Sequence, residues 1–394
     1  MDMIFEDSAA DKAERTHLLD ELDALVKGEP FSRELWACLW LADLDRLRSI
    51  VADTRNVKYP AELLNGFQVR VINSNLVRHW KQQTRNVSRP TSAASTPLRP
   101  STPTLPEVSE SPTTELSGSR KRRRDGLLRR DRLQSDRCRE RDQNLCVLTK
   151  AGDPEVAHIF PFAMRHLQTE EARAEPFSPW ACLKLFWTEE KVNQWFSAIQ
   201  ATTETPRNLF CLCPNAHAYQ AKGYFALKNI GNSEDNTSQT VMFVWMPDFN
   251  NSPSTLRVCT DPSTCTESVV RFRKVATGGV VGLLDTLTGL PTASGDQIIL
   301  QTPDPVNLPL PDPDLLGLHW VLQRVVAMAA GAEPTEMIQN DTDSDDEYGT
   351  MIYDDSDASD LYPSKKPAIS SSILDNEKGM APRLDVSLGP CCTK

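Results

Sequence analysis

The sequence lacks the features that would carry it into or across a membrane. A membrane-spanning helix needs about eighteen consecutive apolar residues, and the longest candidate, VATGGVVGLLDTLTGL, is interrupted by Asp285 and several glycines. The first residues, MDMIFEDSAADKAERTHLLDELDALV, also lack the basic stretch followed by an apolar stretch that marks a secretory signal. We therefore expect a soluble intracellular protein with no membrane partner.

The cysteines lack the paired spacing of a structural zinc site. The chain has ten cysteines, but one residue separates Cys211 from Cys213 and seven separate Cys138 from Cys146. Neither spacing is that of a zinc knuckle. Because intracellular compartments keep thiols reduced, we expect free cysteines.

The chain is poor in glycine and in apolar residues, and its charge is unevenly spread. It has 17 glycines against 28 prolines, and 39% of its 394 residues are hydrophobic, which favours one domain with long tails over two domains. The formal net charge of −11 argues against a nucleic-acid partner only if the charge is uniform. However, residues 120–142 hold eleven Lys or Arg against five Asp or Glu, whereas residues 333–360 hold eleven acids and no base.

Composition predicts four regions. Residues 1–86 form a helical region with helices over Arg33–Val51 and Ala61–Trp80, either as a small domain or as helices that pack on the rest of the protein. Residues 87–119 are a Pro/Ser/Thr linker that is too polar to fold. Residues 120–333 have a mixed α and β pattern, and residues 334–394 are an acidic disordered tail.

A dense basic cluster opens the third region. It comprises Arg120, Lys121, Arg122, Arg123 and Arg124, followed by Arg129 and Arg130. Nuclear import receptors and phosphate backbones both bind such clusters. The cluster predicts a nuclear or nucleocytoplasmic protein that binds nucleic acid and an import receptor; the alternative is the solvated start of a helix.

The next segment predicts a β-hairpin. Cys146–Thr149 and Glu155–Phe160 are short apolar runs separated by Lys150–Pro154, which has the chemistry of a turn. His158 would lie in the second strand. A histidine in an apolar strand usually has a structural role, so this position alone does not establish a site.

A second histidine follows about fifty residues later. Asn208–Cys213 predicts an extended segment that enters a helix at Pro214, and this helix carries His217. In between, Trp180, Trp187 and Trp195 recur at helical spacing and predict core positions, whereas His166 predicts a surface position. Asn208 and His217 could equally be a turn residue and a packed helix residue.

Taken in order, these segments resemble the HNH endonuclease domain common in filamentous fungi. The resemblance is carried by a basic helix, Arg141-Asp142, a strand from Cys146, Ala157-His158-Ile159, a Trp-rich insert, Asn208, His217, Gly223–Lys228, a strand over Val241–Trp245 and a closing helix over Pro311–Val325. It spans about 210 residues and implies an α+β fold, with a ββα-metal core, a helical insert and a closing helix.

The resemblance also implies a chemistry for the three polar residues. His158 would be the general base that activates water against phosphorus, a role suited to the near-neutral pKa of histidine. His217 would bind a divalent ion, with Mg²⁺ expected first and Mn²⁺ or Zn²⁺ as alternatives. Asn208 would bind the ion or brace the loop that orients His158. The substrate would be nucleic acid, with DNA favoured over RNA.

Two positions depart from the pattern of the family. Ala157 replaces the metal ligand that often precedes the base, and Gln220 and Ala221 occupy the positions of a further ligand one turn after His217. Glu155 shares a strand face with Ala157, but a two-residue offset moves it by about 6–7 Å. The alternative to an endonuclease is therefore a catalytically weak HNH-fold module that binds nucleic acid or protein.

Overall fold

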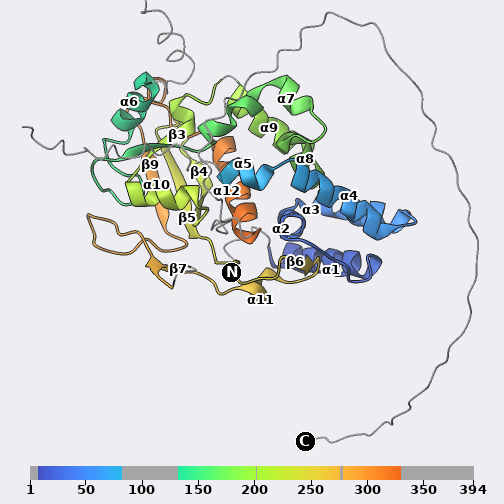
Figure 1. Ribbon diagram of the computed structural model, residues 1–394. Helices are drawn as coiled ribbons and strands as arrows, with labels where there is room; N and C mark the ends of the chain where they lie inside the picture. Colours follow the sequence, from blue (N-terminus) through green and yellow to red (C-terminus); the bar gives the residue numbers. More distant parts are fainter. Residues whose placement is uncertain (1–7, 82–131, 201, 276–277, 330–394) are drawn as a thin grey trace, which may run out of the picture. The chain divides into compact units, whose positions relative to one another are not determined.

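A computed structural model describes residues 8–81, 132–200, 202–275 and 278–329 (Figure 1). The predicted linker over 87–119, the basic residues from Arg120 to Arg130 and the tail over 334–394 lie outside this part of the chain. Helices and strands are mixed throughout the rest, as expected for an α+β protein. None of the described helices is both long and apolar enough to span a membrane.

Residues 8–81 are helical, but the predicted boundaries are wrong. The helices are α1 (Ala9–Leu25), α2 (Arg33–Leu41), α3 (Leu44–Asn56), α4 (Pro60–Asn73) and α5 (Leu76–Lys81). The helix predicted over Arg33–Val51 divides because Ala42 is extended and Asp43 takes the N-cap position of α3. The helix predicted over Ala61–Trp80 divides at Asn75, whose φ of 50° ends a right-handed helix.

The remaining described helices surround the histidine-bearing segments. They are α6 (Arg132–Arg141), η3 (Phe162–Gln168), α7 (Glu170–Ala174), α8 (Pro179–Phe186), α9 (Glu189–Gln200), η4 (Pro206–Asn208), α10 (Pro214–Ala221), α11 (Pro262–Cys265) and α12 (Pro313–Met328). Trp180, Trp187 and Trp195 are buried and His166 is exposed, which confirms both predictions. Pro214 is the first residue of α10, as predicted.

The described strands form four small antiparallel sheets. They pair β1 (Pro30–Ser32) with β6 (Thr255–Arg257), β2 (Glu155–His158) with β3 (Leu209–Leu212), β7 (Arg273–Lys274) with β8 (Val280–Val281), and β4 (Phe225–Asn232), β5 (Ser238–Trp245) and β9 (Gln297–Gln301) in that order. The strand β2 therefore pairs with a segment about fifty residues away, and α10 follows directly from β3.

The predicted hairpin partner of β2 is wrong. Cys146–Thr149 forms no strand, and Val147–Thr149 is a turn. A single bridge joins the flanking residues Leu145 and Gly152, and the Val147 N–H donates to the Cys211 carbonyl of β3 at 2.9 Å. Lys150 and Asp153 adopt φ values of 57° and 51°, which close the segment into a tight loop instead of two extended strands.

The closing helix α12 is buried along its length and packs against β4 (Figure 1). Asp312 caps its N-terminus by accepting from the backbone N–H of Asp314 at 2.9 Å. The turn between α10 and β4 lies close to this helix, and Gly223 adopts a φ of 71° there. A Cβ atom at Gly223 would lie 3.0 Å from Val326, so the turn needs glycine for its conformation and for its space.

The N-terminal helices share one hydrophobic core with the rest of the described chain. Leu19 in α1 and Val325 in α12 belong to the same buried cluster, and α2 packs against α12. The indole N–H of Trp36 donates to the Thr260 carbonyl at 2.9 Å, and that of Trp40 donates to the Val258 carbonyl at 3.0 Å. Because large aromatic side chains bury much of the apolar surface of a core, removing α2 would expose the face of α12.

Candidate functional site

His158 ends β2, and its imidazole is held by a carboxylate that sequence reasoning missed. Nε2 lies 2.6 Å from Oε1 of Glu204, and both side chains are largely buried, with 9% and 16% of their surface exposed. An ionised carboxylate only accepts hydrogen bonds, so this contact favours the tautomer with the proton on Nε2. The lone pair is then on Nδ1, where it can accept a proton from water.

Asn208 is fully buried at the end of η4, and both the oxygen and the nitrogen of its side-chain amide are hydrogen-bonded to backbone groups. Its Oδ1 accepts from the Phe160 N–H at 2.7 Å, while Nδ2 donates to the Phe160 carbonyl at 3.0 Å and the Thr203 carbonyl at 2.9 Å. A backbone bond also runs from the Ile159 N–H to the Asn208 carbonyl at 2.8 Å. These contacts fix the chain just after His158, and they favour the bracing role over the metal-binding role.

His217 lies in α10 beside a second carboxylate. Its Nδ1 is 2.6 Å from Oε2 of Glu155, the first residue of β2. Both side chains reach solvent, with 22% and 47% of their surface exposed. The two-residue offset of Glu155 from Ala157 therefore does not prevent it from reaching the helix histidine, and a His nitrogen and a carboxylate oxygen are donors that divalent ions accept.

The positions where the family pattern calls for further ligands, Ala157, Gln220 and Ala221, hold no residue of the His, Cys, Asp or Glu type. Ala157 and Ala221 are buried. Gln220 points to the backbone instead, because its Nε2 donates to the His158 carbonyl at 3.1 Å. Among the described residues, no group of three ligand atoms close enough for one ion includes His158 or His217.

A buried polar chain continues from Gln220 into the closing helix. Gln323 donates through Nε2 to the Gln220 carbonyl at 2.9 Å and lies 3.3 Å from Nε2 of His319. Burial lowers the pKa of His319 to about 3, so this histidine is neutral at ordinary pH. These hydrogen bonds connect α12 to α10 and, through the Gln220 side chain, to β2, which carries His158.

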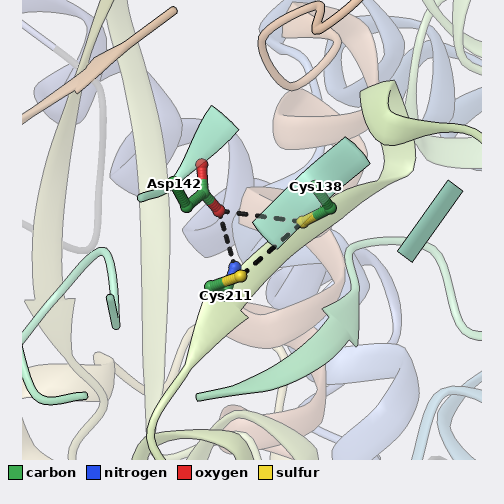
Figure 2. Close-up of side chains that lie close together, drawn as sticks. All are labelled: Cys138, Asp142 and Cys211. Atoms are coloured by element: carbon green, nitrogen blue, oxygen red, sulfur yellow. Dashed lines mark hydrogen bonds between the residues drawn. The ribbon is translucent and has the colours of Figure 1, made fainter. Parts of the chain in front are cut away.

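Three ligand-type side chains meet between α6 and β3 (Figure 2). The ligand atoms of Cys138, Asp142 and Cys211 all lie within 4.8 Å of one another. The two sulfurs are 3.9 Å apart, and Oδ2 of Asp142 accepts from the Cys211 N–H at 2.8 Å. A hydrogen bond with Cys211 and burial raise the pKa of the Cys138 thiol well above its usual range, so this sulfur is protonated.

A buried arginine lies beside this group and pairs with its carboxylate. Arg141 donates to both oxygens of Asp142, at 2.7 and 3.1 Å, and lies 3.6 Å from the Cys138 sulfur. It also donates to the carbonyls of Pro206 and Leu209, at 2.8 and 2.7 Å. The guanidinium already balances the carboxylate charge, and its contacts flank Asn208, so the group supports the site structurally.

The predicted nucleic-acid-binding residues are not placed. Arg120, Lys121, Arg122, Arg123, Arg124, Arg129 and Arg130 all lie outside the described residues. Sequence reasoning also passed over Arg165 in η3, seven residues after His158. Its guanidinium carbon lies 4.6 Å from the ring centre of Phe162, which in turn contacts the His158 ring.

Comparison with known proteins supports the HNH family for the segment that holds these residues. A family model described as HNH endonuclease matches residues 146–228, which include His158, Glu204, Asn208 and His217. The match covers less than the 120–333 domain predicted from the resemblance. No curated protein matches the chain, and neither does any solved structure.

Proposed function

We propose that the protein is a divalent-metal-dependent endonuclease that hydrolyses phosphodiester bonds of nucleic acid, with DNA preferred to RNA. The observation that carries the proposal is the setting of His158. Its ring lies against Glu204, its carbonyl accepts from Gln220, and Asn208 fixes Ile159 and Phe160 directly after it. Two contacts on this partly exposed histidine, with the residues after it held by Asn208, suit a base that must keep a defined direction. The match to the HNH endonuclease family agrees with this assignment.

In the proposed reaction, His158 takes a proton through Nδ1 from a water whose oxygen attacks phosphorus. The new P–O bond forms as the opposite P–O bond breaks, and the leaving oxygen takes its proton from solvent. Glu204 stabilises the imidazolium that results, because its carboxylate accepts the Nε2 proton at 2.6 Å. The ring then returns its proton to solvent.

Glu155 and His217 would hold the divalent ion, which would neutralise charge on the phosphate when bound. The two residues fit an ion such as Mg²⁺, which binds few protein ligands and keeps water and substrate phosphate as the rest. With Mn²⁺ or Zn²⁺ the same pair would supply one nitrogen and one oxygen donor. In this proposal Asn208 acts as a brace and not as a ligand.

The test is cleavage of plasmid and single-stranded DNA and RNA by the full-length protein, with Mg²⁺, Mn²⁺, Zn²⁺ or a chelator. The full chain is needed because the N-terminal helices share the core. The variant His158→Ala should abolish metal-dependent cleavage. His166→Ala is the matched control, since this exposed histidine of η3 contacts only the Ala163 carbonyl and the His79 ring in the described residues. Equal loss in both variants, or cleavage that survives in His158→Ala, would contradict the assignment.

A second candidate is an HNH-fold module that binds nucleic acid or protein with little cleavage. The observation that favours it is the burial of Ala157 and Ala221, which leaves the site with two ion ligands where related sites have more. Metal-independent nucleic-acid binding without cleavage by well-folded protein would support this candidate over the endonuclease.

Entry into the nucleus through an import receptor belongs to the same proposal. It rests on the five consecutive cations from Arg120 to Arg124. A fluorescent fusion of the full chain should concentrate in the nucleus, and replacement of these five residues by glutamine should disperse it. An unchanged distribution would remove this part of the proposal.

A further inference from the structure

An arginine without a carboxylate partner among the described residues contacts the same phenylalanine ring as the proposed base. The Phe162 ring centre is 5.6 Å from that of His158 and 4.6 Å from the guanidinium carbon of Arg165. These two separations form two sides of a triangle, so the guanidinium carbon lies within about 10 Å of the imidazole centre. Arg165 is partly exposed and pairs with no carboxylate among the described residues.

The hydrogen-bond donors of Arg165 bond to no other described residue, and its guanidinium lies over the Phe162 ring. A guanidinium that stacks on an aromatic ring uses its face, while its N–H groups point outward in the plane of the fork. This fork matches two oxygens of a phosphate and forms two parallel charge-assisted hydrogen bonds. The ring of Phe162 also limits the rotamers of the arginine, so less freedom is lost when a phosphate binds.

Another arginine of the same insert shows the contrasting arrangement. The guanidinium carbon of Arg173 also lies 4.6 Å from a phenylalanine ring centre, that of Phe196. Arg173, however, pairs with Glu170 at 3.4 Å and donates to Asn193. The ring contact is thus common to both arginines, whereas within the described residues only Arg173 of the two has a carboxylate partner.

We propose that Arg165 binds a backbone phosphate of the nucleic acid and so positions the strand for attack at His158. The inference rests on the proposed function and names the contact that places its substrate. Phosphate contacts position a strand without reading its sequence, so the same contact would serve DNA and RNA, single or double stranded.

The test measures binding and not cleavage. Fluorescence anisotropy with the full-length protein in chelator would give Kd for labelled 20-nucleotide DNA and RNA of one sequence, as single strands and duplexes, over a range of salt concentrations. Arg165→Gln should raise Kd about tenfold at low salt. It should also reduce the slope of log K against log salt by about 0.9 on duplex DNA and about 0.7 on single strands. Arg165→Lys should fall between the two, because lysine keeps the charge but loses the fork.

Arg173→Gln is the matched control and should bind like the wild type. Thermal unfolding of both glutamine variants would show that each is folded at the assay temperature. Equal Kd and equal salt slope for Arg165→Gln and wild type would overturn the proposal, as would a wild type that binds no nucleic acid. Arg165-dependent binding without cleavage would instead support this inference while removing the endonuclease proposal, so the two failures are distinguishable.

Discussion

Replacing Asn208 by alanine tests whether this residue braces the loop after His158 or binds the metal ion. The substitution removes three hydrogen bonds of 2.7, 3.0 and 2.9 Å and leaves the N–H and carbonyl of Phe160 and the carbonyl of Thr203 without their partner. Each buried polar group that loses its partner costs about 1–3 kcal/mol. Because the backbone bond from Ile159 to Asn208 survives and the loop can relax, we expect a total loss of about 3 kcal/mol.

The loss is measurable as a shift of the unfolding midpoint. For a folded unit of this size, 1 kcal/mol corresponds to about 2–4 °C, so Tm should fall by about 6–12 °C. Asn208→Asp should be at least as destabilising, since a carboxylate oxygen would face the carbonyls of Phe160 and Thr203. Asn65→Ala is the control, because this partly exposed side chain in α4 makes one 3.4 Å hydrogen bond, to Glu29.

Cleavage assays at a temperature where the variants stay folded complete the test. Asn208→Ala should lower kcat, since the strand after His158 is no longer fixed, but it should leave the metal dependence unchanged. The bracing role would be refuted by a variant that loses less than about 1 kcal/mol of stability yet needs more Mg²⁺ for the same rate. That result would assign Asn208 to the ion.

Three further substitutions test the surroundings of His158. Glu204→Gln should lower kcat at least tenfold with little change in KM, since the side chain would no longer carry the charge that stabilises the imidazolium formed in the reaction; a wild-type kcat would exclude the positioning role. Arg141→Lys should lower the free energy of unfolding, measured in urea, by about 3 kcal/mol, because lysine cannot replace the guanidinium bonds to Asp142 and to three backbone carbonyls. A decrease below about 1 kcal/mol would contradict this account. The pKa of His319 is about 3 in the folded protein against 6.5 for a free histidine, so between these pH values only the unfolded chain binds the proton. The free energy of unfolding should therefore fall by up to about 1.4 kcal/mol per pH unit as pH drops from 6.5 towards 3. His319→Gln should show a shallower pH dependence of stability, and an unchanged dependence would show that His319 is not its source.

Local patterns predict the elements of this protein better than their partners. The strand entering a helix at Pro214 and the three buried tryptophans follow from turn chemistry and helical spacing. The pairing of β2 with β3 joins residues 155–158 to residues 209–212, and no local pattern reports such a contact. The tight loop after Cys146 depends on positive φ at Lys150 and Asp153, which residue type alone does not require.

The same limit explains why Glu204 escaped notice. It lies in the polar stretch Thr202–Thr205, 46 residues after His158, and nothing in its spacing marks it as a partner. The division of the N-terminal helices has a clearer signal in retrospect, because Asp43 is a residue type that favours an N-cap. An aspartate within an apolar helical pattern is therefore worth testing as a boundary.

His158 and the residues after it have more hydrogen-bond partners than His217 has, and this difference leads to a prediction about metal binding. Glu204 and Gln220 contact His158, and Asn208 fixes the residues directly after it, whereas His217 has Glu155 as its partner. Two protein ligands bind Mg²⁺ weakly, because most of its shell remains water. Cleavage by the full-length protein should therefore keep rising through roughly the millimolar range of Mg²⁺, and Glu155→Gln should move that rise to higher concentration without changing the rate at saturation. Saturation at micromolar Mg²⁺ in both proteins would show that other residues hold the ion.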